Sequence, residues 1–317
     1  MPPRRPAATA WRSRNDSPAT VARRAVVSNR GTMDLRKTPA LPLLFVLLWS
    51  TGFLGARLGL PHAPPLTFLA LRYVAVLVLM TAIALATRAP WPRGVRAWAH
   101  IGLSGLLLHA VYLGGVFIAI SRGLPAGVAS LVVGLQPLLT AIAAGLFLGE
   151  TVRARQWGGL LLGFAGVALV VFGKTGGGFG AAALVPACIA LVAITAGTLY
   201  QKRWCPAFDW RTGVVAQFVP SALVTAAAAV LFEDRAVDWT GAFVFALGWL
   251  VLVLSVGAVS LLNRLIRQGD VVNVASLFYL VPPCTALFAW WLFDERLTGL
   301  ALGGMALAVW GVYLARR

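Results

Sequence analysis

The feature that most constrains this chain is a succession of ten apolar runs, separated by short polar gaps, between residues 41 and 315. Each run is long enough for an α-helix to cross the hydrocarbon core of a bilayer, which takes about 17–25 residues. A transmembrane β-strand needs only about 9–11 residues, so helices are predicted and a barrel is not. The predicted spans are 41–60, 66–87, 97–121, 124–148, 156–173, 179–201, 212–232, 241–263, 271–293 and 298–315.

Composition and charge placement agree with an all-α, polytopic membrane protein. The chain is 59% hydrophobic and 12% charged, about half the charged fraction of a soluble domain. Its net charge of +17 does not indicate nucleic-acid binding, because nearly all the basic residues lie in an N-terminal segment and in the short gaps. With the N-terminus inside, inner gaps and the C-terminus hold twelve basic residues and outer gaps hold five. The positive-inside rule therefore predicts that both termini lie on the cytoplasmic side of the membrane.

A repeat links the two halves of the chain. Shifting the sequence by 145 positions places "LQPLLTAIAAGLFLGE" (135–150) on "LVPPCTALFAWWLFDE" (280–295) without a gap. The repeat contains five spans, and because five is odd the second copy must cross the membrane in the opposite direction. Two inverted five-helix repeats are typical of transporters with alternating access.

The predicted domains follow from this repeat. They are a first repeat at 39–173, a linker at 174–180 and a second repeat at 181–317. Residues 1–38, polar and rich in arginine, have three interpretations: a disordered tail, a transit-like peptide, or translated upstream sequence with Met33 as the true start. We favour the last.

Prolines stand at matching places inside two spans. Pro137 lies near the middle of the fourth span, and Pro282 and Pro283 near the middle of the ninth. A proline removes one backbone hydrogen bond and exposes the carbonyl four residues earlier. Interrupted helices at equivalent positions of two repeats indicate a substrate site. A kink that only shapes packing is the alternative, and the sequence leaves both open.

Polar side chains within spans are scarce, so as a group they are the candidates for lining a substrate cavity. The candidates are Trp49, Ser50, Arg72, His109, Tyr112, Gln136, Thr198, Tyr200, Ser255, Asn263 and Tyr279. No Asp or Glu lies deep in a span. A carrier that exchanges organic cations for protons needs such a carboxylate, so this absence disfavours a cationic-drug antiporter.

Two of these candidates carry or can acquire charge. Arg72 lies about 9 Å below the outer start of its span. Its side chain can snorkel back to the interface, or it can face the cavity and attract carboxylates. His109 is the deep group that titrates near neutral pH, either as a proton relay or as a neutral residue bonded within the bundle.

Nothing in the sequence indicates an enzyme, a metal site or a cofactor. The stretch "GKTGGGFG" (173–180) is not a P-loop, because the motif requires glycine where Ala168 stands. The three cysteines are scattered without metal-ligand or disulfide spacing.

Several segments together resemble the drug/metabolite transporter superfamily in its EamA-type, ten-helix branch. They are "LLWSTGFLGARLGL", "PPLTFLALRY", "GLPAGVASLVVGLQPLLTAIAAGLFLGE", "ARQWGGLLLGFAGVALV", "AITAGTLYQKRW" and "YLVPPCTALFAWWLFDERLTGLALGGMALAVWGVYLA", within residues 40–315. Arg72 falls on the family's usual arginine, and Glu150 and Glu295 on its "G-E" span ends, although Asp294 replaces the second glycine. The resemblance implies a bacterial inner-membrane carrier, often an exporter of small metabolites such as amino acids, built as two inverted bundles around a cavity.

The sequence thus predicts a secondary transporter that exports a small solute across the lipid bilayer by alternating access. The alternatives are a multidrug efflux carrier and a non-transporting scaffold or sensor. Proton coupling and a homodimer remain open at this point.

Overall fold

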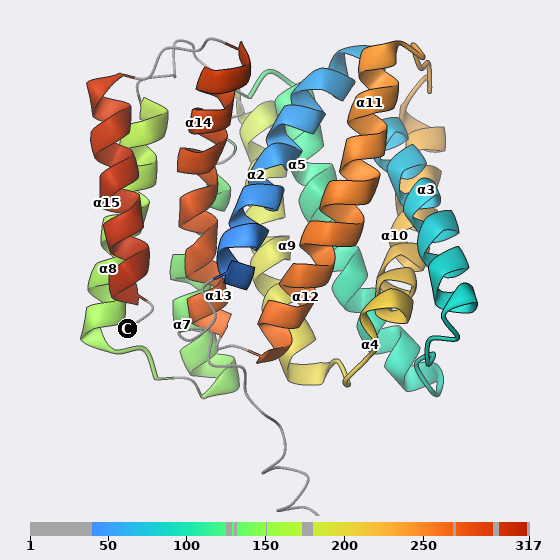
Figure 1. The fold of residues 1–317 in the computed structure, drawn as a ribbon, viewed down its shortest axis with the longest axis horizontal. Coiled ribbons are helices and arrows are strands. Elements are labelled where there is room, and N and C mark those ends of the chain that lie inside the picture. The colour runs from blue at the N-terminus through green and yellow to red at the C-terminus, as the bar shows by residue number, and fades with distance from the viewer. Residues whose placement is uncertain are drawn as a thin grey trace, which may run out of the picture.

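The computed structural model describes residues 40–124, 129, 132–149, 151–172, 180–268, 271–293 and 298–315, and every regular element within them is helical. The predicted extension 1–38 lies outside the described residues, and so does the predicted linker apart from Gly180. The helices stand side by side as one bundle, with segments from both halves of the chain interleaved (Figure 1).

The described helices correspond one to one with the ten predicted spans. The first half contains α2 (Ala40–Gly59), η1 (Leu60–His62), α3 (Pro65–Ala86), a third span of α4 (Val95–Gly105), η2 (Leu106–Val111) and α5 (Tyr112–Ser121), then α7 (Gln136–Leu148) and α8 (Ala154–Phe172). The second half contains α9 (Ala181–Trp204), α10 (Trp210–Phe232), a span of α11 (Gly241–Trp249), η3 (Leu250–Ala258) and α12 (Val259–Gln268), a span of α13 (Val271–Ala275), η4 (Ser276–Leu280) and α14 (Val281–Phe293), and α15 (Gly299–Ala315).

The surface of this bundle suits a bilayer. Seven of the described helical segments are long and apolar enough to cross one, and shorter apolar helices cover Gln136–Phe147 and Gly299–Ala315. Large apolar side chains point outward from several of these helices, among them Val78, Leu146 and Leu223, each at least 68% exposed. Apolar side chains like these can pack against lipid tails, whereas a soluble monomer rarely exposes so many of them to water. The protein is a multi-pass membrane protein.

The repeat of the sequence is also a repeat of the structure. Adding 145 to residue numbers carries the first residues of α3, α7 and α8 onto those of α10, α14 and α15. The middle of the third span is π-helical in both halves, because η2 shifted by 145 falls within η3. A π-helical stretch has five-residue hydrogen-bonded turns and is frequent at functional sites.

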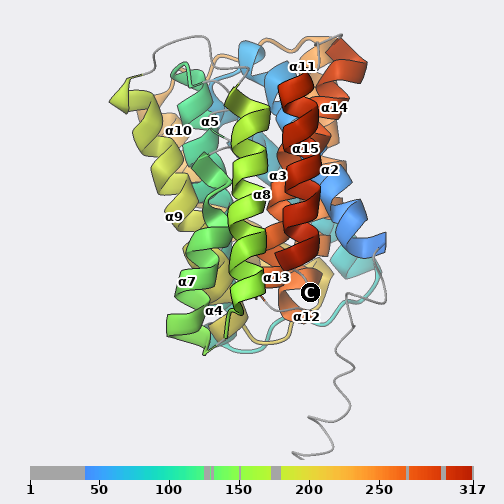
Figure 2. The ribbon, with the colours of Figure 1, turned by 90° about the vertical axis from the view of Figure 1, so that its left-hand side faces the viewer.

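The seam between α8 and α15 shows that the two repeats are inverted. These two helices lie side by side in both views (Figures 1 and 2). A Cβ on Gly166 would lie 2.4 Å from the Ala308 nitrogen and 2.6 Å from the Gly304 oxygen, and a Cβ on Gly311 would lie 2.3 Å from the Gly163 nitrogen and 2.7 Å from the Gly159 oxygen. A shift of 145 converts the first set of contacts into the second, as a two-fold axis between antiparallel helices requires.

The helices that contain the paired prolines are interrupted at equivalent places. Pro137 is the second residue of α7 and follows a turn at 134–135. Pro282 and Pro283 are the second and third residues of α14 and follow the 3₁₀ turn η4. Since a proline at the start of a helix has no N–H bond to lose, each helix restarts there instead of running through.

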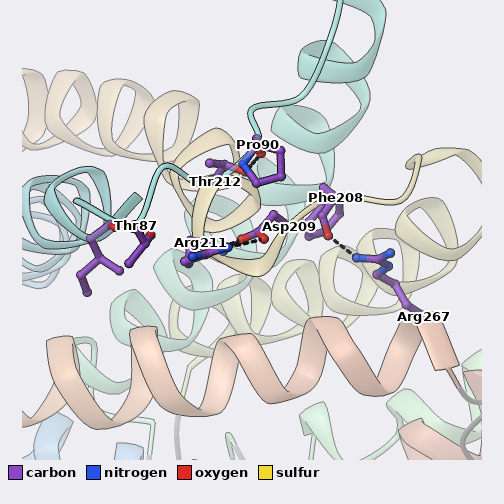
Figure 3. Close-up of polar contacts among 8 residues, drawn as sticks. Thr87, Pro90, Phe208, Asp209, Arg211, Thr212 and Arg267 are labelled. Atoms are coloured by element: carbon purple, nitrogen blue, oxygen red, sulfur yellow. Dashed lines mark hydrogen bonds and ion pairs between the residues drawn. The ribbon is translucent and has the colours of Figure 1, made fainter. Parts of the chain in front are cut away.

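The start of α10 is fastened by polar contacts at the predicted cytoplasmic end (Figure 3). Asp209 accepts a hydrogen bond from the Arg211 backbone N–H at 2.9 Å and forms a bidentate pair with its guanidinium. These bonds hold the pKa of the Asp209 carboxyl below its usual range. Arg267, on the last turn of α12, donates to the Phe208 carbonyl, and its guanidinium lies 5.0 Å from the Phe208 ring centroid.

At the opposite end the second half caps a helix of the first. The carboxylate of Glu233, which follows α10, accepts hydrogen bonds from the Leu66 and Thr67 backbone N–H groups at 2.8 and 2.7 Å, and one from the Thr67 hydroxyl. These N–H groups belong to the first turn of α3, where Pro64 supplies no side-chain cap. A carboxylate there also complements the positive end of the helix dipole.

Candidate functional site

A small pocket of about 40 Å³ lies between the two halves, in the part of the bundle nearer the predicted outer ends of its helices. The first half supplies side chains from α2, α3 and the third span, and the second half supplies side chains from η3 and α12. The lining residues are Trp49, Gly52, Ala56, Arg72, Tyr112, Leu113, Val116, Phe117, Ile120, Leu254 and Val259. Three predicted cavity residues, Trp49, Arg72 and Tyr112, are among them.

Arg72 is the charged group of this pocket. Its side chain is 3% exposed, so the guanidinium stays inside the bundle and does not snorkel to the interface. Its Nε donates a hydrogen bond to the Ser255 hydroxyl at 2.9 Å, which brings a fourth predicted residue to the site. Ser255 lies in the π-helical stretch η3 and is fully buried. The described residues offer Arg72 no carboxylate within 4 Å.

The other predicted candidates do not line this pocket. Two of their hydroxyls bond back to their own helices, as serine and threonine often do: Ser50 to the Val46 carbonyl at 2.6 Å and Thr198 to the Ile194 carbonyl. Ser50 also reaches the Val281 carbonyl at 3.3 Å, beside the paired prolines. Tyr200 shares a 2.6 Å hydrogen bond with His100 near the predicted cytoplasmic end.

His109 is buried but lies outside the pocket lining. It lies in η2 with its ring 4.2 Å from that of Phe218, and its backbone carbonyl accepts a hydrogen bond from Tyr73 at 2.9 Å. Neither ring nitrogen has a hydrogen-bond partner in the part of the chain that the structure describes. Both expected roles, a proton relay and a neutral histidine held within the bundle, stay predictions.

Two further candidates flank the proline breaks of α7 and α14. Gln136, fully buried, precedes Pro137, and neither its amide nitrogen nor its oxygen is bonded within the described residues. Tyr279 precedes the Pro282–Pro283 pair, and its ring packs so closely on Gly163 that a Cβ there would lie 2.6 Å from it. The Tyr279 hydroxyl has no partner among the described residues either.

A cluster of three amides, which we call the amide cluster, lies toward the predicted cytoplasmic end. Its members are Gln201 on α9, Gln217 on α10 and Asn263 on α12, all at most 2% exposed. Gln201 Nε2 donates to Asn263 Oδ1 and Asn263 Nδ2 donates to Gln217 Oε1, both at 2.9 Å. Gln217 Nε2 lies 3.1 Å from Gln201 Oε1 and 3.2 Å from the hydroxyl of Ser104 on α4.

The amide cluster joins the two halves, since Ser104 belongs to the first and the amides to the second. Of its members, Asn263 was among the predicted cavity residues and Gln201 was not. Gln201 stands directly before Lys202 and Arg203, so it reads as the end of a span and not as part of a buried network. Its position along the helix could have revealed it, because Gln201 lies one helical turn after Gly197, on the buried side of α9.

Two inverted helical repeats that enclose a pocket between them define a membrane transporter. The chain belongs to the EamA-like transporter family, whose profile matches residues 38–172 and again residues 181–317. It is therefore a transporter of the drug/metabolite transporter superfamily and not an enzyme, as the resemblance in its motifs indicated.

Individual relatives agree with this assignment. The chain is 28% identical to a probable amino-acid metabolite efflux pump of Escherichia coli, over 88% of this chain and 94% of that protein. It is 29% identical to a probable terminal-alkyne amino-acid exporter of Streptantibioticus cattleyicolor, over 90% and 95% of the two chains. A protein of known crystal structure shares the fold with a TM-score of 0.72 at 23% identity, covering 87% of this chain and 95% of that one.

Proposed function

We propose that this transporter exports amino acids or related small metabolites across the inner membrane by alternating access. The observation that carries the proposal is the pocket between the halves, whose walls come from both repeats and contain one buried cation and no carboxylate among the described residues. The names of the two relatives, an amino-acid metabolite efflux pump and an amino-acid exporter, support the substrate class and the direction.

The pocket and the amide cluster would form the two sides of the transport path. The pocket reaches toward the outer ends of α2 and α5, where Ala56 and Ile120 line it. The amide cluster lies on the other side of the bundle's middle and joins α4 to α9, α10 and α12. We assign it the role of closing the cytoplasmic side. Alternating access requires this closure to open again. Hydrogen bonds between neutral amides allow that, because each bond contributes only about 1 kcal/mol net when water can replace the partner.

Both termini would lie in the cytoplasm, as the distribution of basic residues between the gaps predicts. Coupling to protons stays a prediction for His109, the buried group whose ring nitrogens are unpaired in the described part of the chain. A homodimer also stays a prediction.

The experiment is solute counterflow in proteoliposomes. Vesicles loaded with one unlabelled solute from a panel of amino acids, organic acids and cationic drugs are diluted into its labelled form, with and without an imposed pH gradient. Accumulation of amino-acid solutes above protein-free vesicles supports the proposal. Accumulation of cationic drugs alone supports the multidrug alternative, and no accumulation of any solute supports a scaffold or sensor; either outcome contradicts the proposal.

A further inference from the structure

The guanidinium of Arg72 lacks a counter-charge. Arg72 is 3% exposed, is bonded through Nε to the neutral Ser255 hydroxyl, and has no ion pair among the described residues. Its two terminal nitrogens have no hydrogen-bond partner in that part of the chain, and they are not fully enclosed by protein, since Arg72 lines the pocket. The two terminal nitrogens of the guanidinium therefore face the space between the two halves.

A permanent cation is costly inside a membrane protein unless an opposite charge meets it. The protein supplies no such charge in the described residues around the pocket, so the missing charge must come with the ligand. Because arginine holds its proton at any physiological pH, the site is cationic in every step of transport. Its planar fork matches a carboxylate with two parallel hydrogen bonds.

The remaining walls of the pocket are apolar. The residues that line the pocket beside Arg72 include Trp49, Tyr112, Val116, Phe117, Leu254 and Val259. The Tyr112 hydroxyl and the Trp49 indole N–H are neutral, so a ligand's ammonium would find no carboxylate to pair with. A single guanidinium balances one negative charge, whereas a phosphate monoester carries nearly two at neutral pH.

We propose that Arg72, oriented by Ser255, is the anchor for the carboxylate of a monoanionic or zwitterionic solute whose other end is apolar. The inference rests on the proposed function and narrows it to a substrate class. The carboxylate is the group that is recognised, and an α-ammonium is tolerated but not required. Organic cations and solutes without a carboxylate are excluded by the unopposed charge.

Ser255 is a positioning residue in this arrangement. Its hydroxyl accepts from Nε, which leaves the two terminal nitrogens directed at the ligand. Its place in the π-helical stretch η3 brings this oxygen to the interior side of the span. Lysine at position 72 would keep the charge but would lose both the Nε–H contact and the fork.

The test measures binding by the purified full-length protein in detergent, from the shift of its thermal unfolding with ligand concentration. The probes share one branched aliphatic chain, which suits the apolar walls of the pocket, and they differ in their end groups. The four probes are L-leucine, 4-methylpentanoate (which lacks the ammonium), isoamylamine (which lacks the carboxylate) and L-leucinamide (whose carboxylate is neutralised).

We expect L-leucine and 4-methylpentanoate to stabilise the protein and the other two probes to have no effect. Arg72→Gln should weaken the binding of 4-methylpentanoate at least tenfold, and Ser255→Ala should weaken it severalfold. Arg93→Gln, which alters an exposed arginine in the gap before α4, is the matched control and should bind like the unmodified protein.

The ligand-free stability of Arg72→Gln separates anchoring from a structural role. Removing an unopposed buried charge should leave the unfolding temperature unchanged or raise it, whereas loss of a structural contact would lower it. The inference is overturned if isoamylamine or leucinamide binds as well as 4-methylpentanoate, if no carboxylate probe binds, or if Arg72→Gln binds normally or is less stable without ligand.

The same probes distinguish the failure of this inference from that of the proposed function. Counterflow of a solute without a carboxylate would uphold transport and overturn the carboxylate site. Binding of 4-methylpentanoate that depends on Arg72, without counterflow of any solute, would uphold the site and overturn the transport proposal.

Discussion

The α8–α15 seam offers a sharp prediction, because the chain supplies both a symmetric pair of tests and a symmetric pair of controls. Gly166 and Gly311 are equivalent under the two-fold relation, and each faces backbone atoms of the opposite helix. Gly158 and Gly303 are also equivalent, lie on the same two helices, and have open space where a Cβ would be. Alanine at the first pair should destabilise the protein, and alanine at the second pair should not.

The magnitude follows from the distances. The Cβ of Gly166→Ala or Gly311→Ala would lie 2.3 to 2.7 Å from backbone nitrogen and oxygen atoms, about 1 Å inside ordinary contact. Backbone cannot rotate aside as a side chain can, so the helices must separate. Overpacking of this kind costs about 1–3 kcal/mol, and a separation of about 1 Å also forfeits up to half of the dispersion energy along the seam. We expect a loss of about 2 kcal/mol for each variant.

The two losses should agree within about 0.5 kcal/mol, since the contacts are images of each other. In Gly166→Ala/Gly311→Ala the loss should be smaller than the sum of the two single losses, because one separation of the helices relieves both clashes. Gly158→Ala and Gly303→Ala should be neutral or stabilise by up to about 1 kcal/mol, the usual gain from replacing a helical glycine.

The assay is reversible unfolding in mixed detergent micelles, followed by tryptophan fluorescence. Equal losses of unfolding free energy in Gly158→Ala and Gly166→Ala would refute the packing argument, because a Cβ at position 158 has no neighbour to displace. A loss at 166 without a similar loss at 311 would refute the two-fold relation itself.

Three further predictions concern the ends of the bundle. Glu233→Gln should lower the free energy of unfolding by about 1–2 kcal/mol in the same assay, because the first turn of α3 loses its charged cap; an unchanged value would contradict this role. Arg211 depresses the pKa of Asp209, so Asp209→Asn should cost stability at pH 7. The difference should shrink as the pH falls through the ordinary carboxyl range and vanish below the lowered pKa of the folded state, where the carboxyl binds its proton in both states; a difference that persists there would exclude the charge as its cause. Gln217→Leu should cost about 1 kcal/mol and should raise the labelling of a cysteine at Ser104 by an impermeant maleimide from the cytoplasmic side, and unchanged labelling would exclude the amide cluster as a barrier.

The helices and their pairing were predictable because the membrane restricts the choice of structure so strongly. Without water, each span must satisfy its backbone internally, so the length of an apolar run alone predicts a helix. The repeat then supplied the long-range arrangement, since an odd number of spans inverts the second copy. Glycines are spaced alike in α8 and α15, which permits close approach, and they meet each other across the two-fold axis.

The site was less predictable, because the sequence argument looked for polar side chains and the pocket is mostly apolar. Val116 and Leu254 line it, yet nothing in the sequence separates them from valines and leucines that face lipid. The π-helical stretches η2 and η3 have no sequence signal either, although η3 contains Ser255, whose hydroxyl accepts the hydrogen bond from Arg72.

The two halves share a scaffold but differ where the chemistry lies. Shifted by 145, Arg72 falls on Gln217, so one position carries the cation of the pocket and its equivalent carries the centre of the amide cluster. Two inverted repeats that were chemically identical would have the same energy in the outward-facing and inward-facing arrangements. Here the cation lies nearer one end and the neutral amides nearer the other, so the two arrangements differ in energy. A carboxylate that binds Arg72 shifts the equilibrium between the two arrangements. The size of the shift equals the difference between its binding free energies for the two arrangements. The scaffold therefore makes alternating access feasible, and with Arg72 as the proposed carboxylate anchor, the Arg72–Gln217 asymmetry would link it to the charge of the solute.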